Sequence, residues 1–208
     1  MLIFDIQYFG NLYYYKLLFN RSYIIFDQYE PHQKKSFNNR CTIAGANGPI
    51  LLSIPLQKGR IQTTPLKDIR ISNDENWQKR HWRSILSSYN ASPWFSFYRD
   101  SMADVFSRPH TFLMDWNLSC LDWTIRQMRM TLHYELNGQD NRPDLSGVAK
   151  QPVRPKTEGV NLNIRYQQVF ESRHGFIPGL SILDLLFCTG PKTSVALLKS
   201  GDLNQLEE

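Results

Sequence analysis

The chain has 208 residues, of which 41% are hydrophobic and 21% are charged, and its formal net charge is +5. This composition is typical of a globular protein, and we expect one domain over residues 1–208 because no internal repeat divides the chain. The positive charge favours an anionic small molecule as partner, although the basic residues are scattered and no run approaches a polybasic tail. The three cysteines lack any CxxC spacing, which excludes zinc ribbons and disulfide scaffolds.

The first 26 residues are apolar enough to raise the question of export. Asp5 and Gln7 come early, and Asn11, Lys16 and Asn20 interrupt the apolar stretch, so the segment does not fit a secretory signal. No window supplies the roughly twenty nearly uncharged residues that a membrane span needs. We therefore expect a cytoplasmic protein without a membrane span.

Short apolar or alternating segments predict an α/β fold with a mixed sheet covered by helices. The expected strands are residues 2–6, 22–27, 41–44, 50–54 and 66–71. A helix over residues 11–19 separates the first two strands, which suggests a right-handed parallel crossover. The third and fourth strands are joined across Asn47-Gly48, the dipeptide that best tolerates the positive φ angles of a tight hairpin turn.

Helices are expected to dominate the middle of the chain. Ser72-Asn73-Asp74-Glu75 has the S-x-x-E form of a capping box and predicts a helix over residues 75–90. Ser92-Pro93 predicts a second helix start, with Ser as the cap and Pro in the first turn. A further helix is expected over residues 111–128, followed by an inner strand over residues 131–136.

The last third predicts a long polar loop and a helix–turn–helix. Residues 137–163 are rich in Gly and Pro and lack periodicity, which fits either a loop over the site or a mobile insertion. The closing helix over residues 181–187 stops at Gly190-Pro191, and a short helix follows to about residue 198. Ser181 and Asp184 fit the cap and the acid of a capping box, and residues 202–208 are expected to fray.

Polar residues at predicted strand ends nominate a ligand site. Gln7 follows the first strand and Asp27 ends the second, and ligands of open α/β sheets gather outside the carboxyl ends of parallel strands. Asn39 and Arg40 open the third strand, where the planar guanidinium of Arg40 could clamp a phosphate or carboxylate. The alternative is that Arg40 forms a structural ion pair with Asp27.

His81 is the candidate for acid–base chemistry. It shares a helix face with Trp77, Ile85 and Tyr89, which recur every four residues. An imidazole titrates near neutral pH and can accept a proton from an amine or hydroxyl nucleophile. A histidine buried in the core by its apolar neighbours is the alternative.

Three stretches resemble the WbqC-like family. They are residues 34–55 (KKSFNNRCTIAGANGPILLSIP), residues 69–93 with Trp77-Gln78-Lys79-Arg80-His81-Trp82 at their centre, and residues 166–190. Asn39 and Arg40 match a position where relatives carry Arg-Asn-Arg, whereas Asn38 departs from it. Relatives often carry Gln-Pro where this chain has Gln7-Tyr8. The resemblance implies a bacterial protein found among polysaccharide genes, with a proposed role as a transferase on surface-sugar precursors.

Three functional interpretations stay open. The first is a transferase that moves an acyl or aminoacyl group, such as glycyl, onto an activated sugar of an O-antigen type polysaccharide, with His81 as base and Arg40 on phosphate. The second is a non-catalytic binding or assembly protein in envelope biogenesis, and the third, motivated only by charge, is a nucleic-acid binder. The chain has no GxGxxG, P-loop, HExxH or GxSxG motif, and its sequence nominates neither a metal site nor a cofactor.

Overall fold

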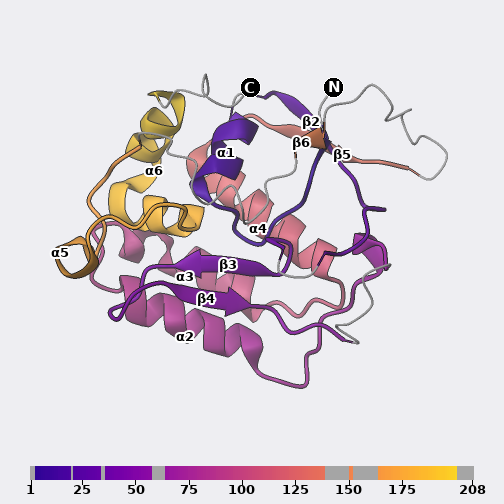
Figure 1. The fold of residues 1–208 in the computed structure, drawn as a ribbon, viewed down its shortest axis with the longest axis horizontal. Helices are drawn as coiled ribbons and strands as arrows, with labels where there is room; N and C mark the ends of the chain where they lie inside the picture. The colour runs from indigo at the N-terminus through magenta and orange to yellow at the C-terminus, as the bar shows by residue number, and fades with distance from the viewer. Residues whose placement is uncertain are drawn as a thin grey trace.

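The computed structural model describes residues 3–19, 21–33, 36–57, 64–138, 150–151 and 164–200. These residues form a mixed α/β structure with parallel and antiparallel strands, which confirms the predicted fold class (Figure 1). The extent of one domain over residues 1–208 stays a prediction. The expected frayed end, residues 202–208, and most of the predicted loop over residues 137–163 lie outside the described residues.

The larger sheet has four parallel strands in the order β5-β2-β1-β6. Its strands are β1 (Ile3–Phe4), β2 (Tyr23–Phe26), β5 (His133–Leu136) and β6 (Lys150–Gln151). The helix α1 (Leu12–Phe19) connects β1 to β2, so the predicted parallel crossover between these strands is confirmed. The segment predicted as an inner strand, β5, instead lies at the edge of the sheet and is largely exposed.

The two strands β3 (Arg40–Ile43) and β4 (Ile50–Ser53) form an antiparallel hairpin, as the sequence predicts. Gly48 in the turn has a φ of 112°, a conformation that favours glycine over other residues. The hairpin pairs only with itself among the described strands, so it forms a separate two-stranded sheet rather than part of one mixed sheet.

The strand predicted over residues 66–71 is wrong, because Leu66–Asp68 form a turn of 3-10 helix. Pro65 precedes this turn, and its carbonyl accepts a hydrogen bond from the Asp68 amide at 2.9 Å. The Leu66 amide donates to the Glu30 carbonyl, which lies in a loop rather than in a strand. The alternation of apolar and polar residues arises because one side of this irregular segment is buried.

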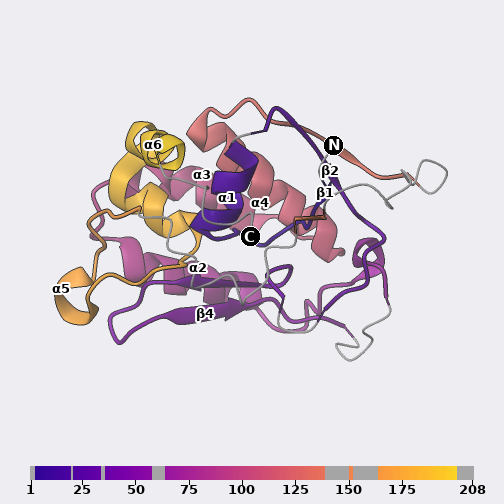
Figure 2. The same ribbon diagram turned by 45° about the horizontal axis from the view of Figure 1, so that its top comes forward.

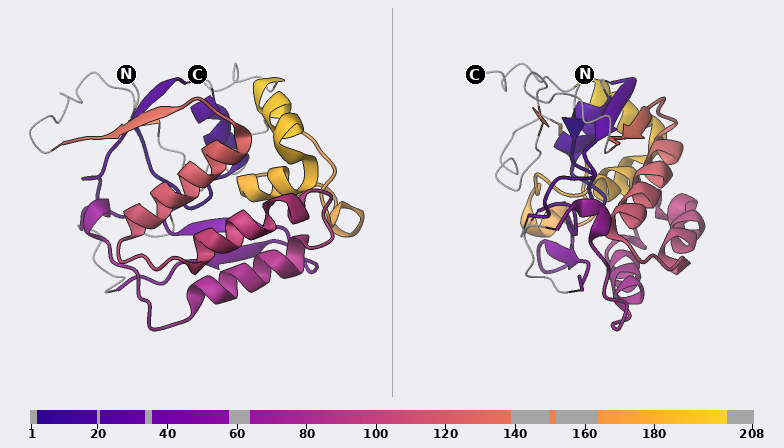
Figure 3. Two further views of the ribbon diagram at one scale, coloured as in Figure 1. Left: turned by 180° about the vertical axis from the view of Figure 1, so that it is seen from behind. Right: turned by 90° about the vertical axis from the view of Figure 1, so that its right-hand side faces the viewer.

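The remaining helices are α2 (Trp77–Tyr89), α3 (Phe95–Ser107), α4 (Leu113–Met128), α5 (Glu171–His174) and α6 (Ile182–Ser200). The rear and edge-on views show α2, α3 and α4 together on one side of the molecule and the strands on the other (Figure 3). Gly190, with φ 74° and ψ 175°, interrupts α6, so the predicted stop at Gly190-Pro191 divides it into two helical arms.

Two predicted helix caps are wrong. The residue that caps α2 is Asn76, without a side-chain cap bond, because Ser72 Oγ donates to Asp74 and Glu75 pairs with Arg80. The helix α3 begins at Phe95, two residues after Pro93, and Ser92 Oγ donates back to the Tyr89 carbonyl at 2.7 Å. Local side-chain bonds therefore compete with the cap geometry that the sequence suggests.

The core is one cluster of buried side chains that is rich in aromatic rings. Trp77 and Trp116 meet edge to face with ring centroids 4.9 Å apart, and Tyr8 lies 6.1 Å from Trp116. Segments far apart in the chain meet in this core, because α1 packs beside α6 (Figure 2). There the buried Lys16 ammonium donates to the carbonyls of Leu198 and Lys199 at the end of α6.

Candidate functional site

Polar residues gather at the carboxyl ends of β2 and β5. Asp27 follows β2 and Asn137 follows β5, and Asn137 Nδ2 donates to Asp27 Oδ1 at 2.7 Å. The same carboxylate oxygen accepts a bond from the Tyr29 amide at 3.0 Å. Both Asp27 and Asn137 are buried. The Asp27 carboxylate therefore shapes this edge of the sheet by tying two neighbouring strand ends together.

The segment that leads into the hairpin runs along the end of β1. Asn38 Nδ2 donates to the Ile6 carbonyl at 2.8 Å, next to the buried side chain of Gln7. Asn39 Nδ2 donates to the Ile54 carbonyl at 3.1 Å, and the Ile54 amide returns a bond to the Asn39 carbonyl. Asn39 thus holds the base of the hairpin, while the neighbouring Asn38 fixes the hairpin to the carboxyl end of β1.

Arg40 carries a positive charge that has no carboxylate partner in the described part of the chain. No hydrogen bond or ion pair joins it to Asp27, and its Nε atom is buried without a partner. The structural ion pair that the sequence leaves open is therefore not found. Arg40 is half-buried, and a buried donor without a protein partner is satisfied in native structures by ordered water or by a bound anion.

His32 is a residue that sequence reasoning missed. It is 7% exposed, and its Nδ1 atom has no hydrogen-bond partner within the described ranges. Burial lowers the pKa of His32, and the positive charge of Arg40 lowers it further, so the two side chains interact electrostatically. Its position, five residues after Asp27 and the end of β2, is the only signal that could have nominated it. We call Arg40 and His32 the anion site.

His81 lies in the aromatic core. The ring is 6% exposed, and its Nδ1 atom is 3.0 Å from the Tyr8 hydroxyl oxygen. This contact uses one of the two ring nitrogens of the imidazole. Burial lowers the pKa of His81 to about 4. His81 is therefore neutral at physiological pH. Its surroundings are those of a buried core histidine, which is the alternative that the sequence leaves open.

A groove of about 550 Å3 lies between α2 and α3. The lining includes Gln78 and Lys79, which precede His81 in the sequence, and Trp82, which follows it. His81 itself does not line the groove. None of the five predicted site residues lines this groove. The structure therefore brings Gln7, Asp27 and the hairpin entrance to the strand ends, and places His81 in the core beside Tyr8.

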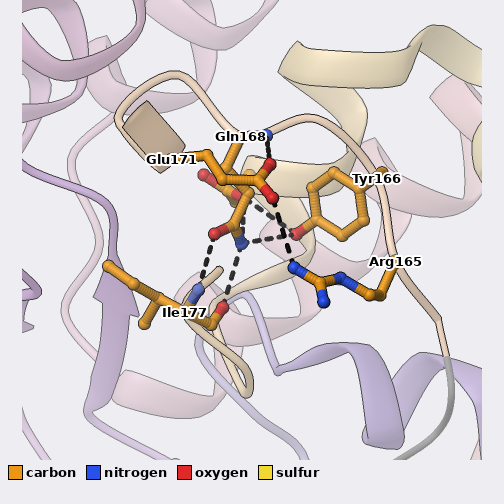
Figure 4. A network of polar contacts seen from close by, with 6 residues as sticks. Arg165, Tyr166, Gln168, Glu171 and Ile177 are labelled. Atoms are coloured by element: carbon orange, nitrogen blue, oxygen red, sulfur yellow. Dashed lines mark hydrogen bonds and ion pairs between the residues drawn. The ribbon is translucent and has the colours of Figure 1, made fainter. Parts of the chain in front are cut away.

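A buried carboxylate, Asp184, organises the closing segment of the chain, whose residues Tyr166, Gln168 and Ile177 are labelled in Figure 4. It accepts hydrogen bonds from the hydroxyls of Tyr89 at 2.8 Å and Tyr166 at 2.7 Å, and from Gln168 Nε2 at 3.1 Å. Gln168 also exchanges two bonds with the main chain of Ile177. The predicted capping-box role of Asp184 is wrong, because its carboxylate is held by these distant partners, although Ser181 Oγ does accept from the Leu183 amide at 3.3 Å.

This network serves the fold rather than a ligand. Asp184 is completely buried, and burial raises its pKa while the bonds from Tyr166, Tyr89 and Gln168 oppose that rise. The Tyr89 hydroxyl also accepts a bond from the Ala44 amide, so the network joins α6 to α2 and to the hairpin. Its donors are all committed to protein partners, which leaves the anion site as the better candidate for binding.

Comparison with known proteins places the chain in a family. The model of the WbqC-like protein family matches residues 7–144, which include all five predicted site residues and His32. The chain is also 27% identical over 206 residues to a Mycobacterium tuberculosis protein described as "Uncharacterized protein Rv1507c", with 84% of this chain and 86% of that protein covered. No solved structure matches. The chain belongs to the WbqC-like protein family.

Two further searches bear on the kind of site. Across the described ranges, no group of three or more His, Cys, Asp and Glu side chains could hold a metal ion. Within the same ranges, none of the helices has the length and apolar character needed to cross a membrane.

Proposed function

We propose that this WbqC-like protein binds a phosphate-bearing small molecule at the anion site and transfers an acyl or aminoacyl group onto an activated sugar. The observation that carries the binding step is the guanidinium of Arg40, which lacks a carboxylate partner and has a buried, unpartnered Nε atom. A phosphate oxygen would accept from Arg40, and His32 would add a second donor once protonated. The family resemblance supports the transfer step, a role in surface polysaccharide synthesis and the cytoplasmic location.

The position of the anion site agrees with this proposal. Asn38 holds the hairpin entrance against Ile6, immediately after the central strand β1, while Asp27 and His32 belong to the segment that follows β2. Ligands of open parallel sheets bind outside the carboxyl ends of such strands. A bound anion would also raise the pKa of His32, because it would offset the positive charge of Arg40.

Calorimetric titration tests the binding step. UDP-glucose, uridine diphosphate and inorganic phosphate are titrated separately, so that recognition of the phosphate is distinguished from recognition of the sugar or base. We expect Arg40→Ala to weaken binding about tenfold or more, with little change in the free energy of unfolding. The matched control is Arg126→Ala, which removes the same charge from an exposed position on α4. Equal affinity of both variants would refute the anion site.

The transfer step is tested with purified protein, sugar nucleotides and a panel of acyl and aminoacyl donors, with products read by mass spectrometry. A new adduct on the sugar that disappears in the Arg40→Ala variant supports the proposal. The general-base role of His81 stays a prediction, and His81→Gln should abolish transfer while leaving calorimetric binding intact if that role is correct. The absence of adducts with every donor would argue against transfer.

A non-catalytic binding or assembly protein is the second candidate, favoured by one observation. His81 is buried, and its Nδ1 atom is in hydrogen-bond contact with the Tyr8 hydroxyl. A base in this state would have to break a core contact before it could reach a substrate. This candidate predicts tight binding of the phosphate-bearing ligand, no adduct with any donor, and no effect of His81→Gln on binding.

A further inference from the structure

The groove between α2 and α3 is a second place where a small molecule could bind, separate from the anion site. Its volume of about 550 Å3 falls in the range of small-molecule pockets. It is lined by residues from the beginning of α2, from the end of α3 and from the segment that follows α3. Neither Arg40 nor His32 takes part in it.

One wall of this groove is aromatic. Trp82 and Phe106 both line it, and their rings are nearly parallel, with centroids 5.9 Å apart and an interplanar angle of 28°. Phe106 is buried and supports the pair from within, whereas Trp82 is only half-buried. A half-exposed indole supported from behind offers a rigid apolar surface with a polar N–H at its edge.

Most of the remaining lining residues are polar, and three of them, Asn73, Asn76 and Gln78, carry amide side chains. Gln78 Nε2 donates to the Arg108 carbonyl at 2.7 Å, and Asn73 Nδ2 donates to the His110 carbonyl at 3.0 Å. These bonds tie the start of α2 to the segment that follows α3, so the shape of the groove is set before any ligand arrives. Asn76 makes no cap bond to the helix that it begins, and an amide offers both donors and an acceptor.

The charge of the groove restricts the class of ligand. Glu75 and Lys79 are the charged residues in its lining, and Glu75 already pairs with Arg80. A single lysine would not compensate the charges of a nucleoside diphosphate. The combination of an apolar ring surface, several amides and little net charge fits a neutral ring that carries hydroxyl groups on its rim and C–H groups on its face.

We propose that this groove binds a single neutral sugar unit, with the C–H face of the ring on Trp82 and its hydroxyls on the amides of Asn76 and Gln78. The sugar would be a unit of a glycan or of a free oligosaccharide. This site goes beyond the proposed function, because it requires neither a phosphate group nor the anion site.

The test uses methyl glucoside, methyl galactoside, N-acetylglucosamine and maltotriose as probes. Saturation-transfer NMR and the indole N–H signal of Trp82 report binding, which we expect in the millimolar range. Trp82→Leu should weaken it about tenfold, and Ala103→Leu should do the same by filling the groove while keeping the aromatic wall. The matched control is Phe97→Leu, which removes an aromatic ring that is 61% exposed and lies outside the groove.

The two proposed sites are separable in this experiment. Arg40→Ala should leave the binding of all four sugar probes unchanged, and Ala103→Leu should leave the binding of inorganic phosphate unchanged. If none of the probes shifts the Trp82 signal, or if Ala103→Leu binds them as well as the natural chain does, the sugar groove is refuted. Because Ala103→Leu introduces a good helix former at a half-buried position of α3, it remains informative if Trp82→Leu fails to fold.

Discussion

Asp184 shows how one buried carboxylate fixes several distant residues at once. Tyr89 belongs to α2, whereas Tyr166 and Gln168 belong to the segment before α5, and all three donate to the same side chain. Each buried donor that loses its acceptor costs about 1–3 kcal/mol, so the loss of Asp184 at the centre of the network costs more stability than the loss of any one partner.

Removal of the carboxylate should therefore be more damaging than removal of one hydroxyl. We expect Asp184→Leu to lower the free energy of unfolding by about 3–5 kcal/mol and Tyr166→Phe to lower it by about 1–2 kcal/mol. When Asp184 has already been replaced by Leu, the further change Tyr166→Phe should lower the free energy of unfolding much less, because the Tyr166 hydroxyl has already lost its acceptor. Urea unfolding at neutral pH measures all four states of this cycle.

The control for this cycle is Tyr134→Phe, whose hydroxyl donates to the exposed Asp122 at 2.8 Å. It should change stability by about 0.5 kcal/mol or less, because both partners are open to solvent. Equal costs of Tyr166→Phe with and without Asp184 would show that the two side chains are not coupled.

Sequence reasoning could not foresee this network. Ser181 and Asp184 are three residues apart, and that spacing predicts a local cap, whereas the carboxylate is held by Tyr89, 95 positions away in the chain. The choice between a local and a distant partner depends on the packing of α6 against α2. That packing is a property of the assembled fold and leaves no periodic signal in the sequence.

Among the helices and strands, the bend in α6 depends on a single residue. Gly190 has a φ of 74° and a ψ of 175°, a region that is essentially restricted to glycine. A Cβ at this position would lie 2.4 Å from the nearest atom of the Trp94 ring. Glycine is therefore required both by the backbone conformation and by the space that the indole occupies.

Gly190→Ala should destabilise the protein by about 2–4 kcal/mol, as the sum of backbone strain and overpacking. The matched control is Gly48→Ala in the hairpin turn, where φ is 112° but no atom lies within 4 Å of the added Cβ. Gly48→Ala should lower the free energy of unfolding only by the cost of backbone strain, about 1–2 kcal/mol. Thermal or urea unfolding of both variants is the measurement, and a smaller loss for Gly190→Ala than for Gly48→Ala would contradict the steric argument.

Local turn chemistry explains which elements could be predicted. Gly48 and Gly190 both have the positive φ angles that glycine favours, so the hairpin and the bend in α6 could be predicted from sequence. The connection between β3 and β4 is longer than the tight Asn47-Gly48 turn that the dipeptide suggests, because the last strand pair is Ile43 with Ile50. The segment over residues 66–71 has an alternating pattern, but its first half forms a 3-10 turn after Pro65, and only Arg70 and Ile71 make isolated bridges to neighbouring chain. An alternation of apolar and polar residues indicates that one side of a segment is buried. It does not distinguish a strand from an irregular segment that packs on the core.

At the scale of the whole molecule, His81 should make stability depend on pH. Its pKa is about 4 in the folded protein, below its ordinary value of 6.5, because burial disfavours the charged ring. The unfolded chain therefore takes up a proton at this residue at a higher pH than the folded chain does. The stability that the neutral ring contributes is present above pH 6.5 and is lost as the pH falls toward 4.

The expected loss is about 3 kcal/mol between these two pH values. Urea unfolding at a series of pH values should show a weaker dependence in His81→Gln than in the natural chain. His133→Gln is the control, since His133 is exposed on β5. An unchanged pH profile in His81→Gln would mean that the folded protein protonates this ring as readily as the unfolded chain does.

The candidate site could be predicted only in part. The strand-end rule nominated Gln7 and Asp27, because it needs no more than the order of the strands. His32 lies on a loop without a pattern, and the groove beside Trp82 arises where two helices meet, so neither has a sequence signal. Arg40 was nominated by its chemistry, but its lack of a carboxylate partner is visible only in the folded chain.

The contacts between segments that lie far apart in the chain have a consequence for the order of folding. The strand β1 is made before its neighbour β6, which comes almost 150 residues later, and Phe9 and Gly10 bond to Ser181 and Ile182. During translation the apolar first segment must wait, without its final neighbours, until the closing helix leaves the ribosome. Such long-range contacts slow folding and expose apolar surface in the meantime. The nascent chain is therefore most vulnerable to aggregation before the helix α6 is made.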